Sequence, residues 1–217
     1  MIRKLLFLSG LSLALYGGAA AAAEDSPPGR FFLHAGPGDV ILAEGAEISA
    51  GGAVIPGATV SANDSVIPIV EAGYYLTPNV AVSFTGGYPP TAHVYGAGTL
   101  AGLGQLADVV YGPMTLTAHY HLLSFGRFRP YIGGGAVFML VFSTSDKLMT
   151  NVDVKSHFGY AGQVGADYVI NNRWGAFLDF KKAHLRTSAT GTMFGAPITA
   201  KVKLDPAAVS GGVSYRF

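Results

Sequence analysis

The C-terminal stretch of residues 209–217 alternates between two kinds of side chain. Apolar residues or glycine occupy every second position and end at Phe217, and the positions between them are small or polar, including Arg216. Successive side chains of a β-strand point to opposite sides, so this period predicts a strand with one apolar face. Termini of soluble proteins usually fray, whereas a membrane β-barrel must pair its last strand with its first. The pattern therefore favours a barrel whose apolar face meets lipid.

The N-terminus predicts export from the cytoplasm. Two basic residues precede an apolar run at 5–15, and small residues at 21–23 fit a signal-peptidase cleavage site. We therefore expect residues 1–23 to be a secretory signal peptide and residues 24–217 to form one β-barrel domain. An uncleaved helical anchor is the alternative, but the run is short against the ~20 residues that a spanning helix needs.

The composition agrees with a membrane barrel. Charged residues make up 12% of the chain, against about 25% in a typical soluble domain. Beyond the predicted signal peptide there is nevertheless no run of apolar residues long enough for a spanning helix. The chain has no Cys and a net charge of +1, so we expect no disulfide framework and no nucleic-acid partner. It has no G-x-S-x-G motif and no phosphate-binding loop, so we expect neither an enzyme nor a cofactor.

Eight extended segments predict an all-β fold, an eight-stranded antiparallel transmembrane barrel. Tight turns alternate with long connections, which is the layout of short periplasmic turns and long extracellular loops. A soluble barrel or sandwich is the alternative, but its interior would need the large side chains that here share a face opposite small ones. The segments are roughly 30–42, 65–76, 80–88, 114–123, 129–142, 157–170, 174–186 and 202–217, and the long connections are 43–64, 89–113, 143–156 and 187–201.

Several stretches together resemble the OmpW family of outer membrane proteins. The resemblance implies an outer-membrane barrel of a Gram-negative bacterium, with a lumen that is hydrophobic toward the outside and blocked toward the periplasm. It also implies passive uptake of small hydrophobic molecules with sideways exit into the membrane, and a barrel-assembly signal at Tyr215 and Phe217. The stretches that carry it are 111–121, 128–135, 158–168, 173–175, 204–206 and 212–217.

The first half of the chain departs from the family pattern at two places. The long connection 43–64 is rich in Gly and Ala, where charged and aromatic residues are expected. The first strand contains Gly36-Pro37-Gly38, and Pro37 cannot donate to a strand ladder. The local geometry of this strand is therefore either irregular or bulged.

Charged residues on the predicted lumen faces suggest a polar plug, because opposite charges in a narrow barrel can pair and fill it. Glu71, Asp167 and Arg216 fall toward the periplasmic ends of their strands, and we expect them to close the lumen there. His119 and His121 share a strand face and could contact one metal, but we favour lumen histidines bonded to carboxylates and predict no metal site. The predicted plug residues are Glu71, His119, His121, Asp167, Asp179, Lys181 and Arg216.

Apolar residues gather at the strand tops and in the long connections, which suggests a groove for a hydrophobic ligand. Methionine adapts to varied apolar ligands and is present among them. The alternative is that these residues pack on each other, or dip into lipid headgroups or lipopolysaccharide. The predicted ligand-lining residues are Leu100, Leu103, Val137, Met139, Phe142, Met193 and Phe194.

Three functions fit these observations: passive uptake of small hydrophobic molecules, a structural or recognition barrel that displays its loops, and a narrow channel for small solutes. An eight-stranded barrel leaves little room beyond its own side chains, which argues against a wide aqueous pore. We favour uptake, with candidate exits at Pro37 or at Pro89 and Pro90. The expected partners are outer-membrane lipid, lipopolysaccharide, the barrel-assembly machinery and small hydrophobic ligands.

Overall fold

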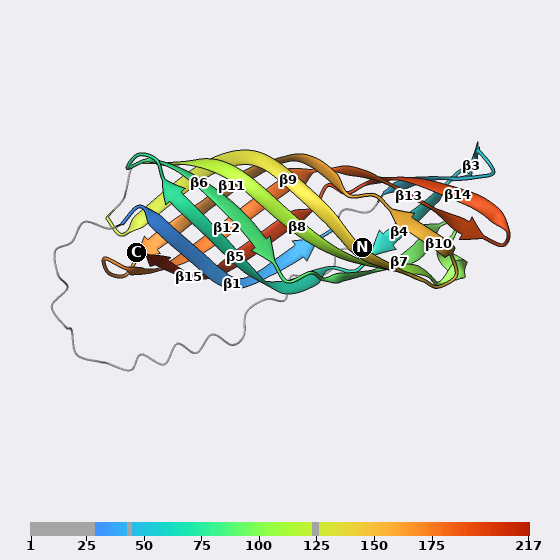
Figure 1. Ribbon diagram of the computed structural model, residues 1–217, viewed down its shortest axis with the longest axis horizontal. Helices are drawn as coiled ribbons and strands as arrows, with labels where there is room; N and C mark the ends of the chain where they lie inside the picture. The colour runs from blue at the N-terminus through green and yellow to red at the C-terminus, as the bar shows by residue number, and fades with distance from the viewer. Residues whose placement is uncertain (1–28, 43–44, 123–125) are drawn as a thin grey trace, which may run out of the picture.

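The structure, a computed structural model, describes residues 29–42, 45–122 and 126–217 as an elongated tube of strands (Figure 1). The predicted signal peptide lies outside these residues. Within them no helix is long and apolar enough to cross a membrane. The described helix is a single turn, η1 (Ala101–Leu103).

Eight antiparallel strands close the barrel. Each strand pairs with the next, and the last pairs with the first from Phe32↔Arg216 to Ile41↔Ala207. This closure removes the sheet edges, which a bilayer cannot satisfy with hydrogen bonds. The predicted barrel and its strand count are confirmed. The strands are β1 (Phe31–Ile41), β5 (Ser65–Tyr75), β6 (Val80–Gly87), β8 (Gln105–His121), β9 (Phe128–Asp146), β11 (His157–Val169), β12 (Trp174–His184) and β15 (Ala207–Arg216).

The four long connections are largely strand, which corrects their interpretation as loops. β4 and β7 extend the barrel sheet beside β8, and a second sheet has the order β10-β13-β14-β2-β3. Together they continue the tube at the end away from the C-terminus (Figure 1). Alternation was weak here because the side chains are small, as in residues 188–192. These strands are β2 (Ala46–Ala50), β3 (Ala53–Val54), β4 (Ala58–Ala62), β7 (Thr91–Gly98), β10 (Thr150–Val154), β13 (Arg186–Met193) and β14 (Ala196–Lys203).

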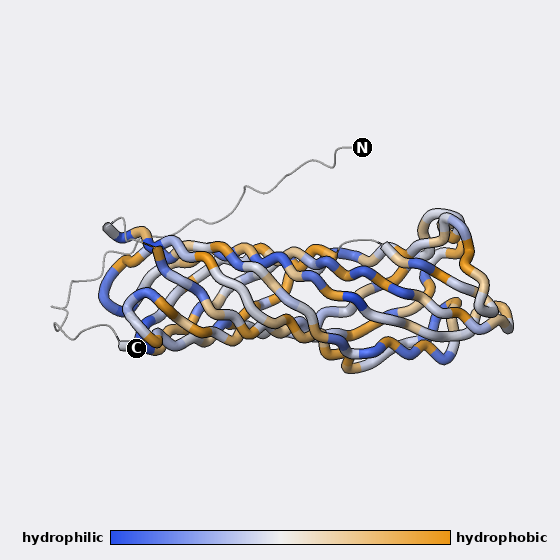
Figure 2. Tube along the Cα trace, turned by 90° about the horizontal axis from the view of Figure 1, so that it is seen from above, coloured by the Kyte–Doolittle hydropathy of each residue, from blue (hydrophilic) through white to orange (hydrophobic). Residues whose placement is uncertain are grey.

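Side chains of the barrel alternate between lumen and exterior as the sequence predicts. On β12, Trp174 and Leu178 are 50% and 64% exposed, whereas Phe177 and Asp179 are 6% and 1% exposed. Orange and blue or pale segments accordingly alternate along the barrel strands (Figure 2). Large apolar residues outside and small or polar residues inside are the arrangement of a barrel that faces lipid.

Aromatic side chains mark the end of the barrel that carries the short turns. The rings of Trp174 and Tyr215 lie 4.7 Å apart, and those of Tyr215 and Phe217 lie 5.0 Å apart. Aromatic residues are enriched where a membrane meets water. Tyr215 and Phe217 therefore lie where the boundary between membrane and water is expected. Their role as an assembly signal stays a prediction.

The seam between β1 and β15 depends on close backbone contact. Strand pairing is interrupted at Gly36 and Pro37, opposite two glycines of β15. A Cβ atom on Gly212 would overlap the carbonyl oxygen of Ala35. On its other side Pro37 stays in register with Pro68 of β5. The glycines thus let the wall stay closed at the point where Pro37 contributes no N–H.

Replacing Gly212 with Ala is expected to lower the free energy of unfolding by about 1–3 kcal/mol, the usual cost of overpacking. The matched control is Gly162→Ala on β11, because a Cβ atom there meets nothing within 4 Å. Urea unfolding in lipid vesicles measures both changes. Equal stabilities of the two variants would contradict a tightly packed seam.

Candidate functional site

A layer of polar side chains crosses the lumen of the barrel. Its members come from β5, β6, β8, β9, β11 and β12, and each is at most 7% exposed. Such residues tolerate burial only when they bond to one another. We call this layer the polar belt: Glu71, Ser83, Thr117, His119, Tyr131, Gln163, Asp179 and Lys181.

Lys181 holds the polar belt together. Its Nζ donates to Glu71 Oε2 at 2.9 Å and to Asp179 Oδ1 at 2.7 Å. The other carboxylate oxygen of Asp179 accepts from the Tyr131 hydroxyl and the Gln163 amide, both at 2.8 Å. One cation thus joins two carboxylates, and further donors satisfy one of them, which is the condition for a tolerable buried ion pair.

Histidines and hydroxyls extend the belt across β6 and β8. His119 Nε2 lies 3.8 Å from Glu71 Oε1 and 3.1 Å from Ser83 Oγ, and Ser83 Oγ lies 3.1 Å from Thr117 Oγ1. His121 instead packs between aromatic rings, with centroids 5.0 Å from Tyr75 and 5.1 Å from Tyr131. In the described part of the chain no group of three or more His, Asp or Glu residues could hold a metal ion.

The predicted plug residues have different bonding partners in the structure. Glu71 bonds to Lys181 within the belt, so it does not meet Asp167 and Arg216 as expected. Asp167 Oδ1 pairs with His34 Nε2 at 3.0 Å, and the Arg216 guanidinium lies 4.3 Å from the centre of the Tyr75 ring. Strands of a barrel are staggered, so the distance of a residue from its strand end does not give its height in the lumen.

Beyond the polar belt the lumen is apolar. A cavity of about 130 Å³ lies between the barrel and the second sheet. We call it the apolar chamber. Aliphatic side chains form most of its lining, which includes Leu42, Val109, Tyr111, Met139, Ala200 and Val202.

A tip cluster of buried side chains lies at the far end of the tube. It joins strands of both sheets and consists of Ile48, Ala58, Leu100, Leu106, Met193, Ile198 and Ala200. Leu103 packs against this cluster. Two predicted ligand-lining residues, Leu100 and Met193, therefore belong to the tip cluster, and a third, Leu103, packs against it.

The remaining predicted ligand-lining residues divide between interior and surface. Met139 lines the apolar chamber, and Val137 is buried beside it in the same hydrophobic core. Phe142 and Phe194 face outward, with exposed fractions of 54% and 76%. The alternation of β9 places positions 137 and 139 inside and position 142 outside, so the pattern itself excludes Phe142. Phe194 has a φ of 51° in the turn between β13 and β14.

The sequence interpretation missed several lumen residues. His34 and Tyr131 are each 2% exposed. Tyr131 shares the inward face of its predicted strand with Val137 and Met139, so strict alternation finds it. His34 lies on the first strand, where no inward face was predicted. Ala200 escaped because it falls in a connection that was not predicted as strand, and Val202 because it begins the predicted segment 202–217 but belongs in the structure to the separate strand β14.

Replacing Lys181 with Met is expected to lower the free energy of unfolding by about 3–5 kcal/mol, since two carboxylates then stay buried without their cation. Adding Glu71→Gln should recover part of this loss. The matched control is Lys182→Met, the next residue of β12, which faces outward. Urea unfolding in lipid vesicles reports all three, and equal effects at positions 181 and 182 would contradict the role of the ion pair.

Known proteins resemble this chain in sequence and in architecture. Residues 27–217 match the OmpW family. Outer membrane protein AlkL of Ectopseudomonas oleovorans is 33% identical over 171 residues, which cover 79% of this chain and 74% of AlkL. The structure of AlkL in lipid bilayers superposes with a TM-score of 0.72 at 30% identity and covers 94% of this chain and 97% of AlkL.

Two further relatives extend the comparison. The dibenzothiophene metabolism operon protein PahQ of Pseudomonas aeruginosa is 32% identical over 195 residues, or 90% of each chain. The structure of OprG from Pseudomonas aeruginosa superposes with a TM-score of 0.82 over 88% of this chain and 97% of OprG. Its 21% identity shows a common fold. With its short turns periplasmic and its extended end extracellular, this chain is an outer membrane β-barrel and belongs to the OmpW family.

Proposed function

We propose that this protein lets small hydrophobic molecules cross the outer membrane passively, by way of the apolar chamber. The observation that carries the proposal is the sharp division of the lumen, aliphatic on the extracellular side of the polar belt and ionic within it. An apolar molecule gains free energy in the chamber, whereas it would have to displace buried ion pairs to go deeper. The name of PahQ refers to metabolism of dibenzothiophene, a hydrophobic compound, which supports such a cargo.

The size of the chamber indicates the class of ligand. Its volume of about 130 Å³ is close to that of an engineered apolar cavity of about 150 Å³ that stays dry and binds benzene. A single aromatic ring or a short alkyl chain therefore fits without rearrangement. Burial of each methylene group contributes about 0.8 kcal/mol, so small cargo binds weakly enough to leave again.

The polar belt argues against the alternative of a channel for small solutes. Lys181, Glu71 and Asp179 occupy the lumen and are almost fully buried. An ion would have to pass through this bonded layer. A molecule that enters the chamber consequently leaves more easily through the wall than through the floor.

The wall between β6 and β8 is the exit that we propose. Their pairing ends at Thr85↔Thr115. On the extracellular side of this point β8 pairs with β7, from Thr91↔Val110 onward. The interval has no ladder, whereas close backbone contact seals the wall near Pro37.

Three prolines make this interval poor in hydrogen-bond donors. Pro89, Pro90 and Pro113 have no N–H. A small cavity of about 60 Å³ reaches the same part of the wall and is lined in part by Gly86, Gly87 and Pro113. Of the two exits considered from the sequence, the one beside Pro89 and Pro90 is thus better supported.

Bridging the interval should slow uptake. The chain has no native Cys, so Gly86→Cys with Met114→Cys can be joined selectively by a short reagent with two thiol-reactive maleimide groups. Uptake of octane by whole cells is expected to fall on cross-linking. It should recover when a cleavable version of the linker is cut. The control pair is Val82→Cys with Ala118→Cys, which are directly paired on the same two strands. Equal inhibition by both cross-links, or by neither, would argue against this exit.

Filling the chamber should also slow uptake. Ala200→Phe places a ring in the chamber, whereas Thr199→Phe places one on the outer face of the same strand. We expect a severalfold lower rate of toluene and octane uptake for Ala200→Phe and little change for Thr199→Phe. If the protein only displays its surface for recognition, neither variant will change uptake, and cells without the protein will take up these compounds equally fast.

A further inference from the structure

Exposed cations of the extracellular half gather on one side of the tube. They lie on β12, β13, β14 or the segment that leads from β10 to β11: Lys155, Lys182, Arg186, Lys201 and Lys203. On the opposite wall Lys147 lies 3.3 Å from Asp108. Asp108 also accepts a hydrogen bond from His93 at 2.6 Å, and these two partners lower the pKa of its carboxyl. The positive charge of that wall is therefore compensated, unlike the charge around β13 and β14.

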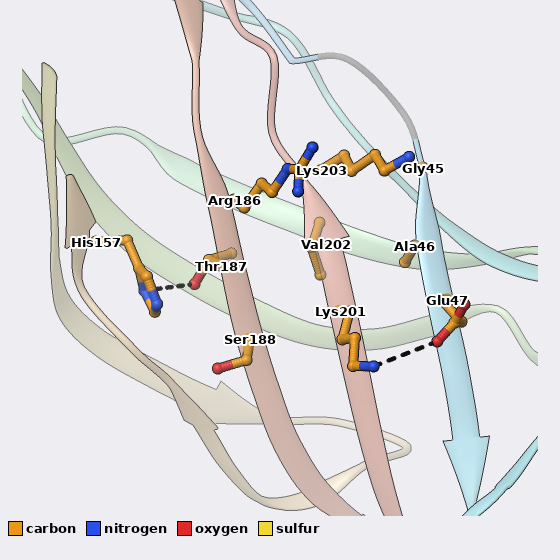
Figure 3. A pocket seen from close by; sticks show the side chains of 10 residues that line it. All are labelled: Gly45, Ala46, Glu47, His157, Arg186, Thr187, Ser188, Lys201, Val202 and Lys203. Carbon is orange, nitrogen blue, oxygen red and sulfur yellow. Dashed lines mark hydrogen bonds and ion pairs between the residues drawn. The ribbon is translucent and has the colours of Figure 1, made fainter. Parts of the chain in front are cut away.

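A hollow of about 590 Å³ lies within this positive region. Arg186 and Lys203 extend beside each other at one end of it, and Lys201 points toward Glu47 on β2 (Figure 3). His157 approaches from β11 and lies 3.2 Å from the Thr187 hydroxyl. We call this feature the basic hollow; its polar lining residues are Glu47, His157, Arg186, Thr187, Ser188, Lys201 and Lys203.

The basic hollow carries more positive charge than its own carboxylate offsets. Arg186 and Lys203 are direct partners in the β13–β14 ladder, and like charges at such positions repel. Neither pairs with a carboxylate in the described part of the chain. Glu47 lies 3.6 Å from Lys201, but both are well exposed, so this pair contributes little. An anion in the hollow would relieve the repulsion.

The height of the hollow on the molecule points to the kind of anion. On the outward face of β12, Leu178 and Phe180 face lipid. The next outward residues toward the extracellular end are Lys182 and His184, and then Arg186 on β13. The ring of Tyr160 lies 5.2 Å from the ring of His184. Aromatic residues of this kind mark the boundary of the apolar band of a membrane barrel. The hollow thus lies just beyond the hydrocarbon, at the level of the headgroups of the outer leaflet.

We propose that the basic hollow binds the phosphate groups of lipid A, the phosphorylated glycolipid that anchors lipopolysaccharide in the outer leaflet. The Arg186 guanidinium suits bidentate bonds to phosphate oxygens, and the ammonium groups of Lys201 and Lys203 add charge that is not directional. The hollow has the volume of a site for a small molecule rather than a single ion, as a phosphorylated sugar requires. Such binding would hold β13 and β14 against the membrane surface.

Binding of lipid A to the full chain in nanodiscs of phosphatidylethanolamine tests the proposal, with native mass spectrometry as the readout. The double variant Arg186→Gln/Lys203→Gln is expected to bind at least about tenfold more weakly, because it loses charge-assisted hydrogen bonds. The matched control is Arg127→Gln/Arg173→Gln, which removes two exposed cations at the periplasmic end. The control should bind like the wild type, and added salt should narrow the difference between variants.

Changing the lipid gives an independent measurement that does not require the variant to fold. The wild-type protein should bind dephosphorylated lipid A about as weakly as the double variant binds lipid A. Equal binding of the two lipids by the wild type would overturn the proposal, as would unchanged binding by the double variant. Displacement of lipid A by an equal concentration of inorganic phosphate would assign the hollow to a free anion and would overturn it too.

Discussion

A chain in lipid must bond its own backbone groups, and the pairing of β15 with β1 is how this protein meets that requirement. The other features of the barrel are constrained by this requirement. Pro37 can stand in a barrel strand because neighbouring glycines let the two backbones approach closely. In the interval between β6 and β8 strand pairing is interrupted, and the prolines there have no N–H to donate. The place of the proposed exit thus follows from the rule that closes the rest of the wall.

Closure in turn creates a narrow interior whose two parts need different chemistry. Around Lys181 the lumen is filled by a bonded network, in which each charge depends on its neighbours for compensation. Toward the extracellular end the same strands present aliphatic side chains, and the second sheet supplies the facing wall. The change takes place along single strands, as between His119 and Tyr111 on β8. On the proposed function, a hydrophobic cargo therefore meets one favourable compartment and one barrier.

Local patterns in the sequence predict which face of a strand a residue occupies. They predict far less well which other residue it contacts. The alternation around Phe177 and Leu178 assigned lumen and lipid correctly, because a pleated strand allows only two directions. The contact between Glu71 and Lys181 depends on strand stagger, which no local pattern encodes. The second sheet was missed because residues such as Ala189 and Gly191 carry little hydrophobic signal. Phe142 faces outward although it is large and apolar, because its position in the alternation of β9 decides its side.

The length of β8 and β9 bears on the hydrated layer outside the membrane. These strands have 17 and 19 residues, whereas a tilted strand crosses the hydrocarbon in about 9–11. Much of each strand therefore extends beyond the hydrocarbon into the hydrated layer outside it, which dissolves oily compounds poorly. On the proposed function, the extension acts as a sleeve that spares the cargo this aqueous stretch. The protein would then spare its cargo a path through water outside the membrane, in addition to helping it across the membrane.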